Sequence, residues 1–125
     1  MTGRIFILIG FGGFLGSILR YITSTLTTRI FPSEFPFGTF AVNFIGCLLI
    51  GIFFGLSDRF NWFTLEWKIF LMTGFCGGYT TFSSFSIENI QLLQNGNYLT
   101  FTLYSIVSFI FCLIATWLGL ALTKI

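Results

Sequence analysis

Long apolar stretches alternate with short polar ones along the whole chain. The apolar stretches cover about residues 4–30, 38–56, 66–93 and 98–122. Each has at least the roughly 20 residues that a helix needs to cross about 30 Å of hydrocarbon. The pattern predicts an all-α membrane protein with four transmembrane helices in a single domain. With an even number of spans, both termini are expected on one side of the bilayer.

The third stretch contains the most polar run of the chain, residues 74–86. It starts with Gly74, Gly77 and Gly78, and each glycine costs a helix roughly 1 kcal/mol against alanine. Five hydroxyl residues follow, interleaved with Phe82 and Phe85. Non-helical backbone at membrane depth is tolerated only where protein or water satisfies its N–H and C=O groups. We therefore predict that the glycines break the third helix mid-membrane, beside an ion or substrate path.

Composition narrows the class of protein. Hydrophobic residues make up 55% of the 125 residues and charged residues only 8%, against about 25% charged in soluble domains. The net charge is +2 and the six basic residues are scattered, so no patch for nucleic acid is predicted. The chain has no histidine and its acids fall in loops and helix ends, so it is not predicted to be an enzyme.

The three cysteines are widely spaced, each inside an apolar stretch: Cys47, Cys76 and Cys112. Without a Cys-x-x-Cys pair or a histidine, neither a zinc site nor a disulfide framework is predicted. We interpret the cysteines as small core or lipid-facing residues.

Glycines recur at a spacing that lets two helix backbones approach closely. The pairs are Gly12/Gly16, Gly51/Gly55 and Gly74/Gly78. Four helices of this length enclose too little space for a pore, so we expect a homodimer. The basic residues determine the orientation of the chain in the membrane only weakly. On one side of the bilayer we expect Arg4, Arg59, Lys68 and Lys124, and on the other Arg20 and Arg29.

Several residues are suited to an anion path. Anions favour the positive edge of an aromatic ring, and Phe82 and Phe85 stand three apart on a helix. Donors that replace a hydration shell come from residues nearby: Asn43, Thr80, Thr81, Ser83 and Ser84. The sequence shows no ring of carboxylates, which a cation pore would use. The alternative is that the hydroxyls and Asn43 join helices and the phenylalanines fill gaps.

Two further sets of polar residues have open roles. Arg20 either extends to the far interface or lines a watery vestibule that attracts anions. Tyr104, Ser108 and Thr116 share one face of the fourth helix. They form a polar track or bond the carbonyls four residues earlier. If two third-helix breaks meet on a two-fold axis, carbonyls near Gly77 and Thr80 are hypothesised to hold Na⁺.

The chain contains three longer motifs: Gly12-Gly13-Phe14-Leu15-Gly16-Ser17-Ile18-Leu19-Arg20-Tyr21, Pro36-Phe37-Gly38-Thr39-Phe40-Ala41-Val42-Asn43-Phe44-Ile45-Gly46, and Gly74-Phe75-Cys76-Gly77-Gly78-Tyr79-Thr80-Thr81-Phe82-Ser83-Ser84-Phe85. In this order and spacing they resemble the fluoride channel family called Fluc or CrcB, over essentially the whole chain.

The resemblance implies an antiparallel, dual-topology homodimer with two fluoride pores and a central structural Na⁺. It implies passive export of cytoplasmic fluoride through a multi-pass protein of the cell membrane, with the bacterial inner membrane expected. The residue roles it implies are the paired phenylalanines Phe82 and Phe85, the pore amide Asn43, the Na⁺ carbonyls of Gly77 and Thr80, the pore tyrosine Tyr104 and the vestibule arginine Arg20. Cys112 departs from the hydroxyl pattern of the fourth helix.

Two other classes fit the size of the chain. A small multidrug transporter also has four helices, but it needs a membrane-embedded acid in the first helix, and residues 4–30 contain none. An accessory assembly subunit predicts no selective polar path and tolerance of Asn43→Ala.

Overall fold

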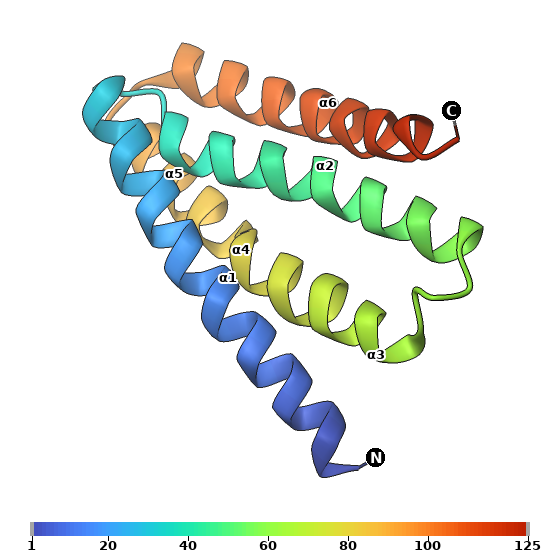
Figure 1. Ribbon diagram of the computed structural model, residues 1–125. Coiled ribbons are helices and arrows are strands. Elements are labelled where there is room, and N and C mark those ends of the chain that lie inside the picture. The colour runs from blue at the N-terminus through green and yellow to red at the C-terminus, as the bar shows by residue number, and fades with distance from the viewer. Residues whose placement is uncertain (1, 125) are drawn as a thin grey trace.

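The computed structural model describes residues 2–124 and is helical wherever the sequence predicts helices (Figure 1). In chain order the elements are α1 (Gly3–Ile30), α2 (Phe37–Arg59), α3 (Leu65–Lys68), the π-helix η1 (Ile69–Cys76), α4 (Gly77–Tyr79), α5 (Phe82–Gln94) and α6 (Tyr98–Leu122). Because α3, η1 and α4 follow one another directly, they form the first half of the predicted third helix. α5 forms its second half.

Within the described residues, three helices have the length and apolar composition to cross a membrane by themselves: α1, α2 and α6. The 13 residues of α5 are too few to do so, because a crossing takes about 20. The run over residues 65–79 is also too short. The all-helical fold and the broken third helix are therefore confirmed.

Two predicted helix bounds need correction. The second helix was expected to end near residue 56, but α2 continues to Arg59. Its last turn is polar because it reaches the end of the bundle, where the Arg59 guanidinium donates to the carbonyl of Thr123. The third helix spans residues 65–94 rather than 66–93 and is interrupted at Thr80 and Thr81.

Glycines bring α1 into backbone contact with the first half of the third helix. A Cβ added at Gly12 would collide with the carbonyl oxygen of Phe70, and one at Gly16 with that of Phe75. From the other side, a Cβ at Gly78 would lie 2.8 Å from the carbonyl oxygen of Gly13. This contact, called the glycine seam below, holds two helices of the same chain together.

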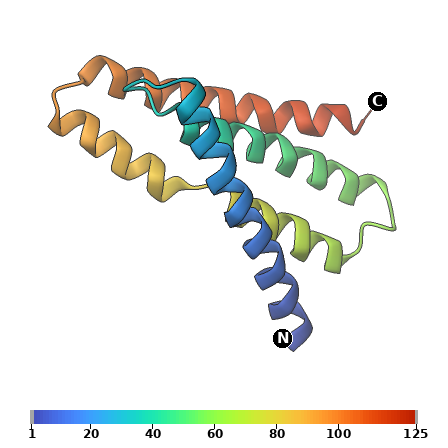
Figure 2. The same ribbon diagram turned by 60° about the vertical axis from the view of Figure 1, so that its left-hand side comes forward.

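α2 and α6 run side by side in both ribbon views (Figures 1 and 2). Their backbones also meet at glycines, since a Cβ at Gly51 would collide with the Thr116 carbonyl and one at Gly119 with that of Leu48. The glycine pairs of the sequence thus pack helices within one chain.

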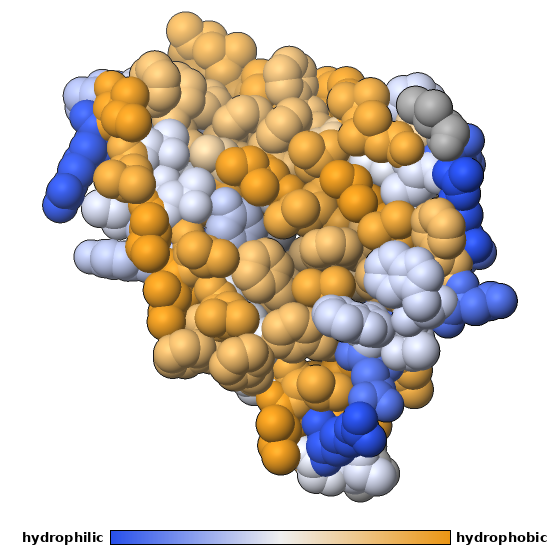
Figure 3. Space-filling model, viewed as in Figure 1, coloured by the Kyte–Doolittle hydropathy of each residue, from blue (hydrophilic) through white to orange (hydrophobic). Residues whose placement is uncertain are grey.

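The ends of the helices define the two ends of the bundle. Arg4 forms an ion pair of 2.6 Å with Glu66 at the start of α3, and Arg59 reaches Thr123 beyond α6. Both described ends of the chain therefore lie at the same end of the bundle, as predicted. Figure 3 shows apolar side chains covering the middle of one face, with hydrophilic ones gathered at its margins.

Candidate ion path at the helix break

The third helix breaks at two threonines rather than at its glycines. Gly77 and Gly78 remain helical, whereas Thr80 (φ −85°, ψ 159°) and Thr81 (φ −151°, ψ 113°) are extended. The prediction that the glycines interrupt the helix was wrong. Gly74 and Gly78 lie instead against the backbone of α1.

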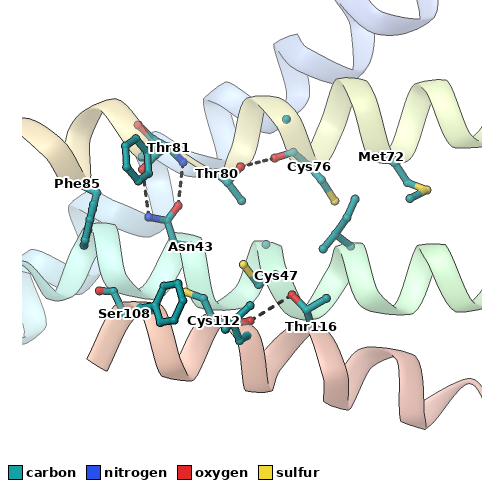
Figure 4. A pocket seen from close by; sticks show the side chains of 16 residues that line it. Asn43, Cys47, Met72, Cys76, Thr80, Thr81, Phe85, Ser108, Cys112 and Thr116 are labelled. Atoms are coloured by element: carbon teal, nitrogen blue, oxygen red, sulfur yellow. Dashed lines mark hydrogen bonds between the residues drawn. The ribbon is translucent and has the colours of Figure 1, made fainter. Parts of the chain in front are cut away.

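Asn43 of α2 holds the broken backbone open (Figure 4). Its Oδ1 accepts the N–H of Thr81 at 2.8 Å, and its Nδ2 donates to the carbonyl of Thr81 at 3.1 Å. In an uninterrupted helix the Thr81 N–H would donate to the Gly77 carbonyl. The amide of Asn43 takes that place, so the carbonyl of Gly77 loses its helical donor.

The second half of the helix starts with its own hydroxyl cap. Oγ1 of Thr81 accepts the backbone N–H of Ser84 at 3.1 Å. The hydroxyls of Ser83 and Ser84 lie 3.3 and 3.1 Å from the same oxygen. Because the N-terminus of a helix carries a partial positive charge, the start of α5 places that charge at the break.

A groove of about 490 Å³ opens between α2, α6 and the broken helix. Many of the residues predicted to act on an ion line this groove: Asn43, Gly77, Thr80, Thr81, Phe82, Phe85 and Ser108. They come from three separate segments of the sequence, and the fold brings them to one place. The rest of the lining is mostly apolar, apart from Thr116 and the three cysteines.

The two phenylalanines differ in their surroundings. The Phe82 side chain is 78% exposed, whereas Phe85 is half-buried. Their ring centroids lie 5.6 Å apart with 41° between the planes. Phe85 also contacts Tyr104, with 4.9 Å between centroids. Phe82 therefore forms the outer edge of the groove and Phe85 its inner wall.

The hydroxyls of α6 separate into two kinds. The Thr116 hydroxyl donates to the carbonyl of Cys112 at 3.1 Å. Thr116 therefore bonds the carbonyl four residues earlier in its own helix, which was one of the two predicted alternatives. Ser108 is only 7% exposed, and its hydroxyl has no hydrogen-bond partner within residues 2–124. An unsatisfied buried hydroxyl costs about 1–3 kcal/mol, so its presence in the groove wall calls for a functional explanation.

The remaining predicted residues lie outside the groove lining. The hydroxyls of Ser83 and Ser84 contact the capping hydroxyl of Thr81 at the start of α5, and Tyr104 is fully buried behind Phe85. Arg20 lies half-buried on α1 and forms no ion pair with any part of the chain that the structure describes. Its role in a vestibule stays a prediction.

A half-buried carboxylate beside the groove was not predicted as a functional residue. Oε2 of Glu88 accepts a hydrogen bond from Thr39 at 2.7 Å, and Oε1 accepts one from Tyr104 at 2.9 Å. The sequence indicated Glu88 only as one of the acids in loops and helix ends. The available signal was the spacing of Thr39 and Asn43, which places two polar groups on one face of α2.

The break also offers ligands for a small cation. Gly77 lacks its helical donor, and the extended Thr80 is outside the helical ladder. Unwound carbonyls of this kind coordinate Na⁺ in other membrane proteins. Within residues 2–124 no three acidic, cysteine or histidine side chains cluster as metal ligands. A metal ion held here would depend on backbone carbonyls.

Comparisons with known proteins agree over nearly the full length of the chain. Residues 7–120 match the family described as CrcB-like protein, Camphor Resistance (CrcB). A protein of Azobacteroides pseudotrichonymphae genomovar. CFP2 named fluoride-specific ion channel FluC is 52% identical, covering 99% of this chain and 98% of its own. Proteins of the same name from Flavobacterium psychrophilum (50% identical; 93% and 94% covered) and Campylobacter lari (45%; 99% and 100%) are also similar.

Proposed function

This chain belongs to the CrcB family, and on that premise we propose that it is a fluoride-specific ion channel of the cell membrane. Fluoride that has entered a cell as HF dissociates in the cytoplasm and is trapped as the anion. An open conduit lowers its internal concentration by letting it leave down its gradient. The chain acts as a transport protein and not as an enzyme.

The observation that carries this proposal is the unpartnered hydroxyl of Ser108. It lines the same groove as Asn43 and the first residues of α5, so a free O–H donor and the positive end of a helix meet there. Buried donors without acceptors suit an anion that sheds its hydration shell. No carboxylate is among the residues that line the groove, which distinguishes it from a cation path.

In the proposed mechanism, donors replace water around the ion one after another. The edges of Phe82 and Phe85 flank the ion at the mouth of the groove, because ring edges carry partial positive charge. The second N–H of the Asn43 amide and the Ser108 hydroxyl follow along the wall. Tyr104 supports Phe85 from behind, and Arg20 attracts anions to the entrance. A narrow, donor-lined passage favours fluoride over the larger chloride.

Two copies in opposite orientations complete the site. The groove is open on its side, yet its wall contains the Ser108 hydroxyl, which has no partner within residues 2–124 and which lipid cannot satisfy. A second copy of the chain supplies the missing cover. The few basic residues on either side favour neither orientation strongly, which is consistent with dual topology.

The carbonyls of Gly77 and Thr80 would hold Na⁺ where two such breaks meet. One chain offers two of these carbonyls, and a two-fold partner doubles the set. Such an ion would neutralise the carbonyl dipoles that the break leaves unpaired and would fix the two chains to each other.

Fluoride efflux from liposomes tests the function. Purified protein is reconstituted, and an electrode records fluoride loss against a chloride control. We expect fast fluoride loss with no chloride loss, and a strong decrease in Phe82→Ile. If well-folded protein gave no fluoride flux, the channel proposal would be wrong, and the small multidrug transporter and the accessory assembly subunit would be the classes to test next.

The assembly is tested separately. Light scattering in detergent is expected to give twice the 14.1 kDa of one chain. A cysteine added at the C-terminal end of a chain whose native cysteines are replaced by serine should be labelled from both sides of the membrane. Labelling from a single side would exclude dual topology.

A further inference from the structure

All three cysteines line the groove, although the sequence places them far apart. Two of them, Cys47 of α2 and Cys112 of α6, lie on helices that pack side by side. Both are free thiols and both line the groove, where Figure 4 shows them between the two helices. The expectation that each cysteine only fills space does not account for this pairing.

The packing around the two thiols is rigid. One turn beyond Cys47, Gly51 lies against the Thr116 carbonyl, and Thr116 is one turn beyond Cys112. The helix backbones are therefore in contact beside the cysteines, and a Cβ at Gly51 would already collide. The two cysteines are therefore held beside each other on adjoining helices.

We propose that Cys47 and Cys112 form a two-thiolate site for a soft divalent cation such as Hg²⁺. Zinc needs four ligands, and the described residues contain no cluster of three acidic, cysteine or histidine side chains. Hg²⁺ is satisfied by two thiolates, because soft metals prefer sulfur and this ion favours linear coordination.

The charge balance also favours a divalent ion. The metal binds as both thiols lose their protons: Hg²⁺ + 2 RSH gives Hg(SR)₂ + 2 H⁺, with no change of oxidation state. The product is neutral, and a neutral complex is the species that an apolar groove accommodates at least cost. A monovalent soft ion on two thiolates would leave a negative charge in the same surroundings.

The position of the site gives it a consequence for transport. Ser108 and Cys112 are one turn apart on α6 and line the same groove. An ion bound to Cys112 therefore occupies the wall next to the unpartnered hydroxyl. If the proposed fluoride path is right, the bound metal blocks it, so this second step rests on the proposed function.

Metal retention tests the site without any transport assay. Reduced protein in detergent is loaded with HgCl₂ and desalted in increasing concentrations of a competing monothiol, and the metal per chain is counted. Wild type and the matched control Cys76→Ser should retain one equivalent. Cys47→Ser and Cys112→Ser should lose it at about a hundredfold lower competitor, because chelation by two tethered groups multiplies affinity by that order.

Equal retention by all four proteins, or loss from all four at the same competitor concentration, would overturn the site. Folding of each serine variant is checked by its elution profile, and Cys47→Ala and Cys112→Ala provide second variants. HgCl₂ is then added to the efflux assay, with each variant compared with its own untreated rate. Retention without block would leave the metal site intact and count against the location of the path.

Discussion

The broken third helix has two faces that solve opposite problems. Toward α1 it presents glycines, and at the glycine seam a Cβ added at Gly12, Gly16 or Gly78 would collide with the facing backbone. Toward α2 and α6 it presents the extended threonines and the groove, where an amide and a free hydroxyl line the wall. One face therefore fixes the helix in place, and the other keeps polar groups open at membrane depth. The comparison shows that the glycines and the polar residues, although adjacent in the sequence, have different roles: the glycines pack the helix against α1, and the polar residues line the groove.

The largest expected effect is on the seam. Gly16→Ala places a Cβ against the backbone of Phe75 and Tyr79, where neither side can give way. Overpacking of this kind costs about 1–3 kcal/mol and often more when backbone must move. We expect a large loss of correctly folded protein, measured as the monodisperse fraction in size-exclusion chromatography and by thermal unfolding.

The matched control is Gly10→Ala on the same helix, where a Cβ meets nothing within 4 Å. Alanine there should leave the yield unchanged or raise stability by roughly 0.5–1 kcal/mol through helix propensity. Equal behaviour of the two variants would contradict the assignment of the seam to packing.

Asn43→Ala is expected to have the next largest effect. It removes both hydrogen bonds to the Thr81 backbone and leaves a buried N–H and C=O unsatisfied, at about 1–3 kcal/mol for each group. The rate of fluoride efflux should fall, and the thermal midpoint of unfolding should fall with it. Thr102→Val serves as control, since that exposed hydroxyl only bonds the carbonyl of Tyr98 on its own helix. Normal efflux in Asn43→Ala would return the chain to the accessory-subunit class.

Tyr104→Phe is expected to have a smaller effect. The ring that packs on Phe85 is retained, and only the hydroxyl that donates to Glu88 is lost. Hydrogen bonds to charged groups contribute about 1.5–3 kcal/mol, and Thr39 still donates to the same carboxylate. The thermal midpoint should drop modestly with a minor change in efflux. A loss of efflux as large as in Asn43→Ala would place the Tyr104 hydroxyl itself on the path.

The extent of the helices was predictable because membrane thickness imposes a length on apolar stretches. The fourth helix, predicted at about residues 98–122, runs from Tyr98 to Leu122. The position of the break was not predictable in the same way. Glycine next to glycine suits an unwound backbone and a close helix contact equally well, and only the position of α1 distinguishes the two.

The candidate residues were largely predictable by type, but their partners were not. Asn43 and Thr81 are 38 positions apart, and no local pattern indicates that an amide on one helix replaces the backbone partner on another. The partners of Glu88 were not predictable for the same reason, since Thr39 and Tyr104 reach it from two other helices. Cys47 and Cys112 likewise become a pair only when α2 and α6 pack.

The most direct test of the account compares two groove hydroxyls on α6. Fluoride efflux and thermal stability are measured in Ser108→Ala, which removes an unpartnered hydroxyl, and in Thr116→Val, whose hydroxyl already bonds the Cys112 carbonyl. We expect Ser108→Ala to keep or gain stability, because a buried unsatisfied group is lost, while its efflux falls about tenfold, equivalent to one unmade hydrogen bond of about 1.4 kcal/mol. Thr116→Val should keep its efflux. Unchanged efflux in Ser108→Ala would contradict the claim that this groove carries the ion.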